Sequence, residues 1–382
     1  MDPGTDASAV TTIGITGSFG GLNAGDEAIL TSVVASLRER LPAVELVVFS
    51  RDEGHTRAHH DVESVVPVRE LTRDEIAAHV QPLDLLLLAG ATVLYADQAR
   101  AALREVRLAQ NLGIATMAFG VGAAPPADPD DRELVRQTLN GMRSITVRDV
   151  GAKRILEHLD VEAPVEVTAD PALLLTPEPF APERLRVEGV PAGRALVGMS
   201  LREPGAAKGD IDADAYHSLL GHAADFVVDR LDSEIVFIPL EPDEVRTAHA
   251  VIARMVSAHH AHVLTRQYRP AELLGLMQHL DMVLAMRLPM LMFAAMAGTP
   301  FVALPAAPAV AEFLRSMGLP APPPATAAGS LLAAVDRVWD LRDREAARLR
   351  AQVRALQERA RRSLEIALQL LPSGAPNPVV VR

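Results

Sequence analysis

Short, almost purely apolar segments alternate with helical patterns along most of this chain, and this alternation constrains the fold more than any other feature. After a first strand near Gly14, it predicts strands at 44–49, 83–88, 114–119, 144–147 and 165–168. Helical patterns lie near 97–112, 131–142 and 149–160. Near-continuous apolar strands are typical of parallel sheets that helices cover on both faces. The first part of the chain is therefore predicted to be a doubly wound α/β domain, in which ligands bind at the carboxyl ends of the strands.

A second α/β domain of similar plan is predicted further along the chain. Residues 176–193 hold four prolines and no periodic apolar pattern, which is typical of a linker. The alternation then resumes, with strands expected near 195–200, 234–239, 262–264, 281–285 and 300–304. We therefore expect two doubly wound, Rossmann-like domains, at residues 1–178 and 190–325.

The final part of the chain is helical by pattern. Apolar residues recur at helical spacing over 328–371, so a long helix is expected within 326–371 and a disordered tail at 372–382. The heptad is irregular, which favours packing of this helix across the domains over a coiled coil. Two similar α/β domains with a long returning helix resemble the architecture of GT-B glycosyltransferases, in which the active site is the cleft between the domains.

Composition excludes several classes of function. The chain has 382 residues and no cysteine, so disulfides, thiolate catalysis and cysteine-ligated metals are ruled out. Its net charge of −12 argues against broad, sequence-independent binding of nucleic acid. No uninterrupted apolar run reaches the roughly 18 residues of a membrane-spanning helix, and the N-terminus lacks the pattern of a signal peptide. We therefore expect a cytoplasmic protein.

Residues 14–30 combine a strand, a glycine-rich loop and a helix with two carboxylates in its first turn. Four glycines lie between positions 17 and 25, and glycine allows sharp turns and close approach to a ligand. Such a unit often binds phosphate at the helix N-terminus, but the spacing matches neither common nucleotide fingerprint. Asp26 and Glu27 would also repel a phosphate. On this stretch alone, a ligand loop and a purely structural turn are equal alternatives.

Six motifs resemble those of the polysaccharide pyruvyl transferase family. They occur in the family's order and extend over about residues 13–318. The motifs are Gly20-Gly21-Leu22-Asn23-Ala24-Gly25-Asp26-Glu27-Ala28-Ile29-Leu30, Ile145-Thr146-Val147-Arg148-Asp149, Val167-Thr168-Ala169-Asp170-Pro171-Ala172, Gly198-Met199-Ser200-Leu201-Arg202, Phe237-Ile238-Pro239-Leu240 with Asp243, and Asp281-Met282-Val283-Leu284-Ala285-Met286-Arg287-Leu288.

The resemblance implies transfer of the enolpyruvyl unit of phosphoenolpyruvate onto sugar hydroxyls, which makes a pyruvate ketal on cell-envelope polysaccharide or on its lipid-linked precursor. Phosphoenolpyruvate is then the donor substrate, a saccharide or lipid-linked glycan is the acceptor, and no metal or other cofactor is expected. Nucleic acid is not an expected partner. Peripheral membrane association through the substrate and a homo-oligomer are both left open.

The resemblance also assigns roles to individual residues. Arg202 and Arg287 would bind the anionic donor, since guanidinium groups suit phosphate and carboxylate, and Asp26 is a candidate base. For Arg148 the alternative is a local ion pair with Asp149, and for Asp170 a role in a turn. The implied substrate-binding residues are Gly20, Gly21, Asn23, Gly25, Glu27, Gly90, Arg148 and Asp170.

The chain departs from the family pattern where the chemistry is expected. Pro289 replaces the histidine of the family's Arg-Leu-His, and residues 306–309 lack its tyrosine and lysine. The family's triple-glycine loop is Ala89-Gly90-Ala91 here, and its Ile-Gly-Pro is Val121-Gly122-Ala123. Proline is tolerated in the first turn of a helix but cannot transfer a proton. Three alternatives stay open: an active pyruvyl transferase, an impaired relative that acts as a binding or scaffold subunit, and a GT-B glycosyltransferase that uses a sugar nucleotide.

Twelve histidines were considered as replacements for the missing one. His217 follows Arg202 by 15 residues and is a candidate by proximity alone. Two other groups have spacings that are poor for a metal, so no metal site is expected. They are His55, His59 and His60 in a polar connection, and His259, His260 and His262 before a predicted strand.

Overall fold

The chain divides into two compact units in the computed structural model, which describes residues 10–21, 23–90, 94, 99–203, 212–305, 307–324 and 328–372. The first unit takes the described residues up to Leu175 together with those from Leu356 onward. The second unit runs from Thr176 to Ala355.

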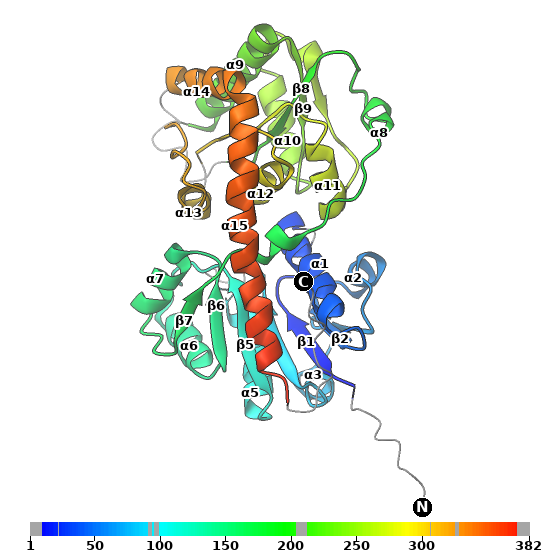
Figure 1. Cartoon of the computed structure of the whole chain (residues 1–382), viewed down its shortest axis with the longest axis vertical. Coiled ribbons are helices and arrows are strands. Elements are labelled where there is room, and N and C mark those ends of the chain that lie inside the picture. Colours follow the sequence, from blue (N-terminus) through cyan, green and yellow to red (C-terminus); the bar gives the residue numbers. More distant parts are fainter. Residues whose placement is uncertain are drawn as a thin grey trace, which may run out of the picture. The chain divides into compact units, whose positions relative to one another are not determined.

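A seven-stranded parallel sheet forms the centre of the first unit (Figure 1). Its strand order is β3-β2-β1-β4-β5-β6-β7, so the direction of winding reverses between β1 and β4. β4 reads Leu-Leu-Leu-Leu-Ala and is completely buried, as a strand covered on both faces requires. The strands are β1 (Thr12–Thr16), β2 (Glu45–Ser50), β3 (Ser64–Pro67), β4 (Leu85–Ala89), β5 (Ala115–Val121), β6 (Ser144–Val147) and β7 (Val165–Val167).

Helices connect these strands and supply the rest of the core. α1 buries Ile29, Leu30 and Leu37, as the helical spacing of its apolar residues predicts. The elements α2, α3 and β3 were not predicted, because each has at most eight residues and gives too short a periodic pattern. The helices of this unit before its C-terminal part are α1 (Ala24–Arg40), α2 (Glu53–His59), α3 (Arg73–Val80), α4 (Ala99–Ala102), α5 (Arg104–Asn111), α6 (Pro129–Asn140), α7 (Val150–His158) and the 3₁₀ turn η2 (Pro171–Leu174).

The second unit repeats this plan on a five-stranded parallel sheet. The strand order is β10-β9-β8-β11-β12, and the winding reverses between β8 and β11. All five strands lie within two residues of the predicted positions. They are β8 (Ala195–Ser200), β9 (Ser233–Phe237), β10 (Ala261–Val263), β11 (Met282–Ala285) and β12 (Phe301–Ala303).

The helices of the second unit begin inside the segment that was expected to be a linker. That segment contains α8, and its Glu178 backbone nitrogen donates to the Ala271 carbonyl oxygen at 3.0 Å, so it packs as part of this unit. The helices are α8 (Glu183–Val187), α9 (Ala213–Leu231), α10 (Glu244–Ile252), the 3₁₀ turn η4 (Ala258–His260), α11 (Pro270–Met277), α12 (Leu288–Ala297), α13 (Pro308–Ser316) and α14 (Ala328–Asp340).

The C-terminal segment forms α14 and α15 (Arg342–Gln369) with a break at Leu341, where one helix was expected. The part of α15 up to Ala355 groups with the second unit, and the remainder groups with the first. In the first unit, the buried Ser363 hydroxyl bonds to those of Thr146 and Thr168 at 3.0 and 2.8 Å. Residues 373–382 of the predicted tail lie outside the described residues. None of the described helices has the length and apolar character that a bilayer crossing requires.

Candidate functional site

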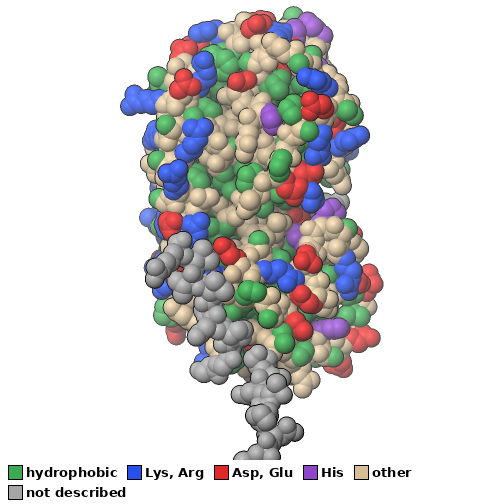
Figure 2. Space-filling view, turned by 45° about the vertical axis from the view of Figure 1, so that its right-hand side comes forward, with side chains coloured by type: hydrophobic (Ala, Val, Ile, Leu, Met, Phe, Trp, Pro, Cys, Tyr) green, Lys and Arg blue, Asp and Glu red, His purple; other side chains and the backbone are tan. Residues whose placement is uncertain are grey.

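In each unit, family-like motifs lie at the point where the strand order of its sheet reverses: the motif after β1 in the first unit, and the motifs that end β8 and β11 in the second. We call these places the first-unit edge (residues 17–21 after β1, with Gly90 after β4) and the second-unit edge (residues 201–203 after β8, with Met286 and Arg287 after β11). Open parallel sheets bind ligands at such switch points, outside the carboxyl ends of the strands. Acidic and basic side chains are interspersed over the face seen in Figure 2, without a broad basic patch.

Two glycines of the first-unit edge are required by packing within the protein. Gly20 has φ +70°, and a Cβ atom there would lie 2.6 Å from the Asp52 backbone nitrogen. A Cβ atom on Gly17 would clash with the Ala89 carbonyl oxygen. These glycines therefore allow the loop to lie against β4 and the start of α2, which differs from the expected close approach to a ligand.

The N-terminus of α1 is capped from within the motif. The Asn23 side-chain oxygen accepts hydrogen bonds from the backbone nitrogens of Gly25 and Asp26, at 2.9 and 3.3 Å. This is the usual role of asparagine at an N-cap. Asn23 and Gly25 thus shape the loop directly, and the capped terminus differs from an open phosphate cradle.

Both carboxylates of the motif are buried, with Asp26 1% and Glu27 5% exposed. Glu27 Oε1 accepts a hydrogen bond from the Gly20 backbone nitrogen at 2.9 Å, which fixes the loop. Burial alone would raise the pKa of the Glu27 carboxyl, but the hydrogen bond and charge of His60, with the Gly20 and His55 contacts, hold it below its usual value. Glu27 is therefore an ionised group at neutral pH.

Two histidines that the sequence reasoning set aside complete the first-unit edge. His60 Nε2 lies 2.7 Å from Glu27 Oε2, and His55 Nε2 lies 3.6 Å from the same oxygen. His60 is buried, whereas the His55 side chain is 17% exposed. One sequence signal could have placed these histidines at the site. The segment that contains them directly follows strand β2, the neighbour of β1, so the first turn of α2 lies at the same sheet edge as the glycine loop.

Arg148 and Asp170 lie after neighbouring strands of the same sheet and bind each other. Arg148 Nη1 is 3.3 Å from Asp170 Oδ2, and Arg148 Nε is 3.2 Å from Asp149 Oδ2. Asp170 also caps η2 through the Ala172 backbone nitrogen at 3.0 Å. Burial raises the pKa of Asp170, although the Arg148 charge opposes that shift. Arg148 therefore forms the local ion pair with Asp149, and Asp170 shapes the turn after β7; both were considered as alternatives to substrate binding.

At the second-unit edge, Arg202 is an exposed cation without an ion pair among the described residues. Its backbone nitrogen donates to Met286 Sδ at 3.0 Å, and Ser200 pairs with Ala285 in the sheet register. The chain after β8 therefore lies beside the chain after β11. The backbones of Arg202 and Arg287 therefore lie near each other.

The side chain of Arg287 is held differently from that of Arg202. It is buried and forms ion pairs with Glu244 and Glu241, the latter at 2.6 Å. Burial raises the pKa of Glu244, and the Arg287 charge opposes that shift. The partner that an arginine in so apolar a stretch requires is thus supplied by α10 and the turn before it.

Two buried hydroxyl groups in this unit have no hydrogen-bond partner among the described residues. They are Ser200 Oγ, at the end of β8, and Tyr216 Oη, in the first turn of α9. Burial and the negative charge of Glu203 raise the pKa of the Tyr216 phenol. Next to Tyr216, His217 Nε2 lies 2.9 Å from Glu203 Oε1, which also accepts from the Thr247 hydroxyl at 3.2 Å. Buried polar atoms without partners are rare and call attention to a ligand or water.

Comparison with known proteins decides the family. A family model described as polysaccharide pyruvyl transferase matches residues 23–306, about three quarters of the chain. The chain belongs to the polysaccharide pyruvyl transferase family. The resemblance carried by the sequence motifs is thereby confirmed. A search of curated proteins by sequence found no match.

Solved structures show which fold this family member has. A glycosyltransferase from Rickettsia africae matches with a TM-score of 0.65 at 12% identity, covering 94% of this chain and 98% of its own. A UDP-GlcNAc 2-epimerase from Neisseria meningitidis matches with a TM-score of 0.64 at 11% identity, covering 94% and 100%. A putative UDP-N-acetylglucosamine 2-epimerase from Listeria monocytogenes gives 0.63 at 14% identity, covering 94% of each chain. The predicted fold class, two Rossmann-like domains of GT-B type, is confirmed.

The departures from the family pattern can now be placed in the second unit. Pro289 is the second residue of α12, in the first turn, where proline fits without loss of a helical hydrogen bond. Pro308 and Ala309 begin α13, while Ala306 lies outside the described residues, as does Ala91 of the first unit.

In the described part of the chain, no three acidic or histidine side chains are arranged to hold a metal. His260 and His262 instead both contact Glu234, each at 2.8 Å.

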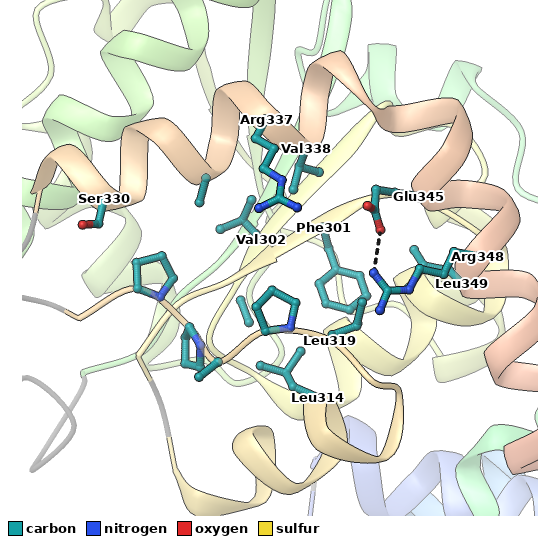
Figure 3. Close-up of a pocket in the computed structure, with 16 residues that line it drawn as sticks. Phe301, Val302, Leu314, Leu319, Ser330, Arg337, Val338, Glu345, Arg348 and Leu349 are labelled. Atoms are coloured by element: carbon teal, nitrogen blue, oxygen red, sulfur yellow. Dashed lines mark ion pairs between the residues drawn. The ribbon is translucent and has the colours of Figure 1, made fainter.

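A cavity of about 320 Å³ in the second unit lies apart from the family motifs (Figure 3). Its walls come from β12, α13, α14, α15 and the proline-rich segment 320–323, and they are mostly apolar. An ion pair between Glu345 and Arg348, at 3.8 Å, borders it. None of the residues that line it belongs to the six motifs, so we do not assign it to the candidate site.

Proposed function

We propose that this protein transfers the pyruvyl unit of phosphoenolpyruvate to hydroxyls of a saccharide or lipid-linked glycan in cell-envelope polysaccharide synthesis. The observation that carries the proposal is the state of Arg202. It is an exposed arginine, without an ion pair among the described residues, at the switch point of the second sheet and inside a family motif. The proposal places the protein in the cytoplasm, where phosphoenolpyruvate is made.

The donor anion is assigned to the second-unit edge. A guanidinium group can hold a phosphate or carboxylate through two parallel hydrogen bonds, which gives both strength and orientation. Ser200 Oγ and Tyr216 Oη have no hydrogen-bond partner in the part of the chain that the structure describes, and the donor would supply acceptors or donors for such groups. Arg287 contributes indirectly in this proposal, since its charge is already balanced by Glu241 and Glu244.

The acceptor is assigned to the first-unit edge. The loop at residues 17–21 is held in place by the Glu27 carboxylate and by the Arg51 backbone nitrogen, which donates to the Phe19 carbonyl oxygen, and its fixed shape suits recognition of a neutral sugar. The loop is flanked by ionised Glu27 and therefore disfavours an anion. In this proposal, the negatively charged donor binds to the second unit and the uncharged sugar hydroxyls bind to the first.

The reaction needs two proton transfers and the release of phosphate. One acceptor hydroxyl adds to carbon 2 of the enolpyruvyl group as the methylene carbon gains a proton and becomes methyl. A second hydroxyl then forms the other carbon–oxygen bond as the bond to phosphate breaks, and phosphate leaves with the remaining proton. No metal or other cofactor enters this proposal.

Release of phosphate is the direct test. The full chain is incubated with phosphoenolpyruvate and a panel of pyranose and lipid-linked acceptors, beside an active member of the family. We expect phosphate release that depends on the acceptor, together with a product heavier than the acceptor by the mass of the added pyruvyl group. A complete lack of release across the panel, with the control enzyme active, would overturn the catalytic proposal.

A second candidate is a binding or scaffold subunit that has lost the chemistry. Pro289 favours it, because a proline stands where the family carries a proton-transferring histidine. In that case phosphoenolpyruvate binds to the protein but no phosphate is released. A sugar-nucleotide transferase is a third candidate, and calorimetric titration with uridine diphosphate would support it by showing saturable binding.

A further inference from the structure

The first-unit edge contains a histidine that the family resemblance does not assign. His55 lies in the first turn of α2, directly beyond the β2 strand, and its backbone nitrogen donates to the Asp52 side chain at 2.8 Å. The start of α2 is tied to the glycine loop, since the Arg51 backbone nitrogen donates to the Phe19 carbonyl oxygen at 3.0 Å. His55 is therefore fixed beside the proposed acceptor loop.

Glu27 lies within ion-pair distance of the His55 ring. His55 Nε2 faces Glu27 Oε2 at 3.6 Å, and the ring stacks on that of His59 with centroids 4.2 Å apart. The other ring nitrogen, Nδ1, has no hydrogen-bond partner among the described residues. A carboxylate on one ring nitrogen with the other nitrogen free is the arrangement by which a histidine accepts a proton and is stabilised as imidazolium.

His60 fixes the position of the carboxylate that lies beside His55. Its Nε2 lies 2.7 Å from Glu27 Oε2, and because an ionised carboxylate only accepts, His60 carries the proton of that bond. The other carboxylate oxygen accepts from the Gly20 backbone nitrogen. Glu27 therefore has one fixed position, set by the loop on one side and His60 on the other.

Accessibility separates His55 from the two carboxylates of the motif and from His60. Asp26 and Glu27 are 1% and 5% exposed, and His60 is also buried. The His55 side chain is 17% exposed. A base must come within hydrogen-bond distance of the hydroxyl that it deprotonates, and a buried group cannot do so unless the protein opens.

We propose that His55 is the proton acceptor for the acceptor hydroxyl, a role that rests on the proposed function. As the oxygen–hydrogen bond of the first sugar hydroxyl breaks, the proton goes to His55 Nδ1 and the oxygen forms its bond to carbon 2 of the enolpyruvyl group, while the electron pair of the carbon–carbon double bond takes up a proton from solvent at the methylene carbon. When the second hydroxyl bonds to carbon 2 and the bond to phosphate breaks, the proton of that second hydroxyl passes to solvent. Glu27 stabilises the resulting imidazolium through Nε2. His60 is a positioning residue that acts through Glu27, and the proton returns from His55 to the departing phosphate.

Substitution with chemical rescue tests the assignment. His55→Ala is expected to lower kcat for phosphate release by about 100-fold or more and to leave KM for phosphoenolpyruvate within about 2-fold. Added imidazole should restore part of that rate, because the site of His55 is open to solvent. The matched control is His79→Gln, an exposed histidine in the same unit, which should keep the wild-type rate and remain insensitive to imidazole.

His60 provides the contrast between positioning and proton transfer. His60→Gln keeps a hydrogen-bond donor for Glu27 and should retain most activity, whereas His60→Ala should lose it. Imidazole should not rescue His60→Ala, because that site is closed to solvent. Melting temperatures of all variants show that each one is folded.

The outcomes separate this inference from the function on which it rests. If the wild type releases phosphate and His55→Ala does so within about 3-fold, the role of His55 is wrong and the transfer activity stands. If His55→Ala is inactive at every imidazole concentration while folded, proton transfer by His55 is wrong. If the wild type itself releases no phosphate with any acceptor, the proposed function fails and the role of His55 fails with it.

Discussion

The guanidinium group of Arg287 is bonded to the Glu244 carboxylate, and the two side chains are only 6% and 4% exposed. Glu241 forms a second ion pair with the same arginine at 2.6 Å. The motif suggests that Arg287 binds the donor anion, yet its charge is already balanced inside the second unit. A buried ion is tolerated only when it is paired, so this contact first maintains the fold of the second-unit edge.

Arg287→Met is therefore expected to lower the free energy of unfolding by about 3–5 kcal/mol, because it leaves the buried Glu244 carboxylate without its cation. Urea denaturation near neutral pH measures this loss. Arg202→Met serves as the matched control and should unfold within about 0.5 kcal/mol of the wild type, since Arg202 is exposed and unpaired among the described residues. Wild-type stability of Arg287→Met, combined with lost affinity for phosphoenolpyruvate, would identify Arg287 as a direct ligand of the donor instead.

Replacement of Arg202 should lower the affinity for phosphoenolpyruvate without lowering stability, whereas replacement of Arg287 should mainly lower stability. Arg202→Ala is expected to weaken phosphoenolpyruvate binding by about 10- to 100-fold, the range for loss of hydrogen bonds to a charged group. The melting temperature should not change. Calorimetric titration measures the affinity, with Arg344→Ala as an exposed arginine control in the same unit. Equal affinities of Arg202→Ala and the wild type would remove the donor from this edge.

The sequence predicts much of this fold because its main signals are local. β4 is four leucines and an alanine, and α12 is almost entirely apolar, so each can be recognised from its own residues. The candidate site depends on contacts between distant residues. Glu27 and His60 are 33 positions apart, and Arg287 and Glu244 are 43 apart. Resemblance to the family's motifs therefore identified the motif residues but not their partners.

The glycine loop shows the same limit at smaller scale. The glycines can be read from the sequence, but the steric contact that requires glycine at each position cannot. Gly20 is required by the neighbouring Asp52 backbone, and a single sequence does not reveal which backbone will lie there. Likewise, the histidines of α2 read as an ordinary polar connection until β2 pairs with β1 and brings them to Glu27.

Glu27→Gln is expected to destabilise the protein in a pH-dependent way. The pKa of Glu27 is lowered in the folded state, so its contribution to stability is present above the ordinary glutamate value of 4.5 and is lost as the pH falls through the lower, folded value. The difference from the wild type should be about 1–3 kcal/mol near pH 7 and should shrink in acid. Urea denaturation at several pH values measures it, and the exposed Glu39→Gln on the same helix should change stability by less than about 0.5 kcal/mol. A difference that grows on acidification would contradict this account.

Pro289→His, alone and with Ala309→Lys, tests whether the second unit lacks a catalytic group. Both positions lie in the first turns of helices, α12 and α13, which follow neighbouring strands of the second sheet. Replacing the helix-starting proline should cost about 0.5–1 kcal/mol of stability, because the unfolded chain gains freedom. If proton transfer limits the wild-type enzyme, the rate of phosphate release should rise by about 10-fold or more.

The control for this experiment is Pro270→His, which replaces a proline in the first turn of α11 in the same unit. It should lose similar stability and keep the wild-type rate. A gain confined to Pro289→His would mean that the fold and the donor site are intact and that one missing side chain limits the chemistry. An unchanged rate, with phosphoenolpyruvate still bound, would mean that the lack of a proton-transferring side chain at position 289 does not limit turnover.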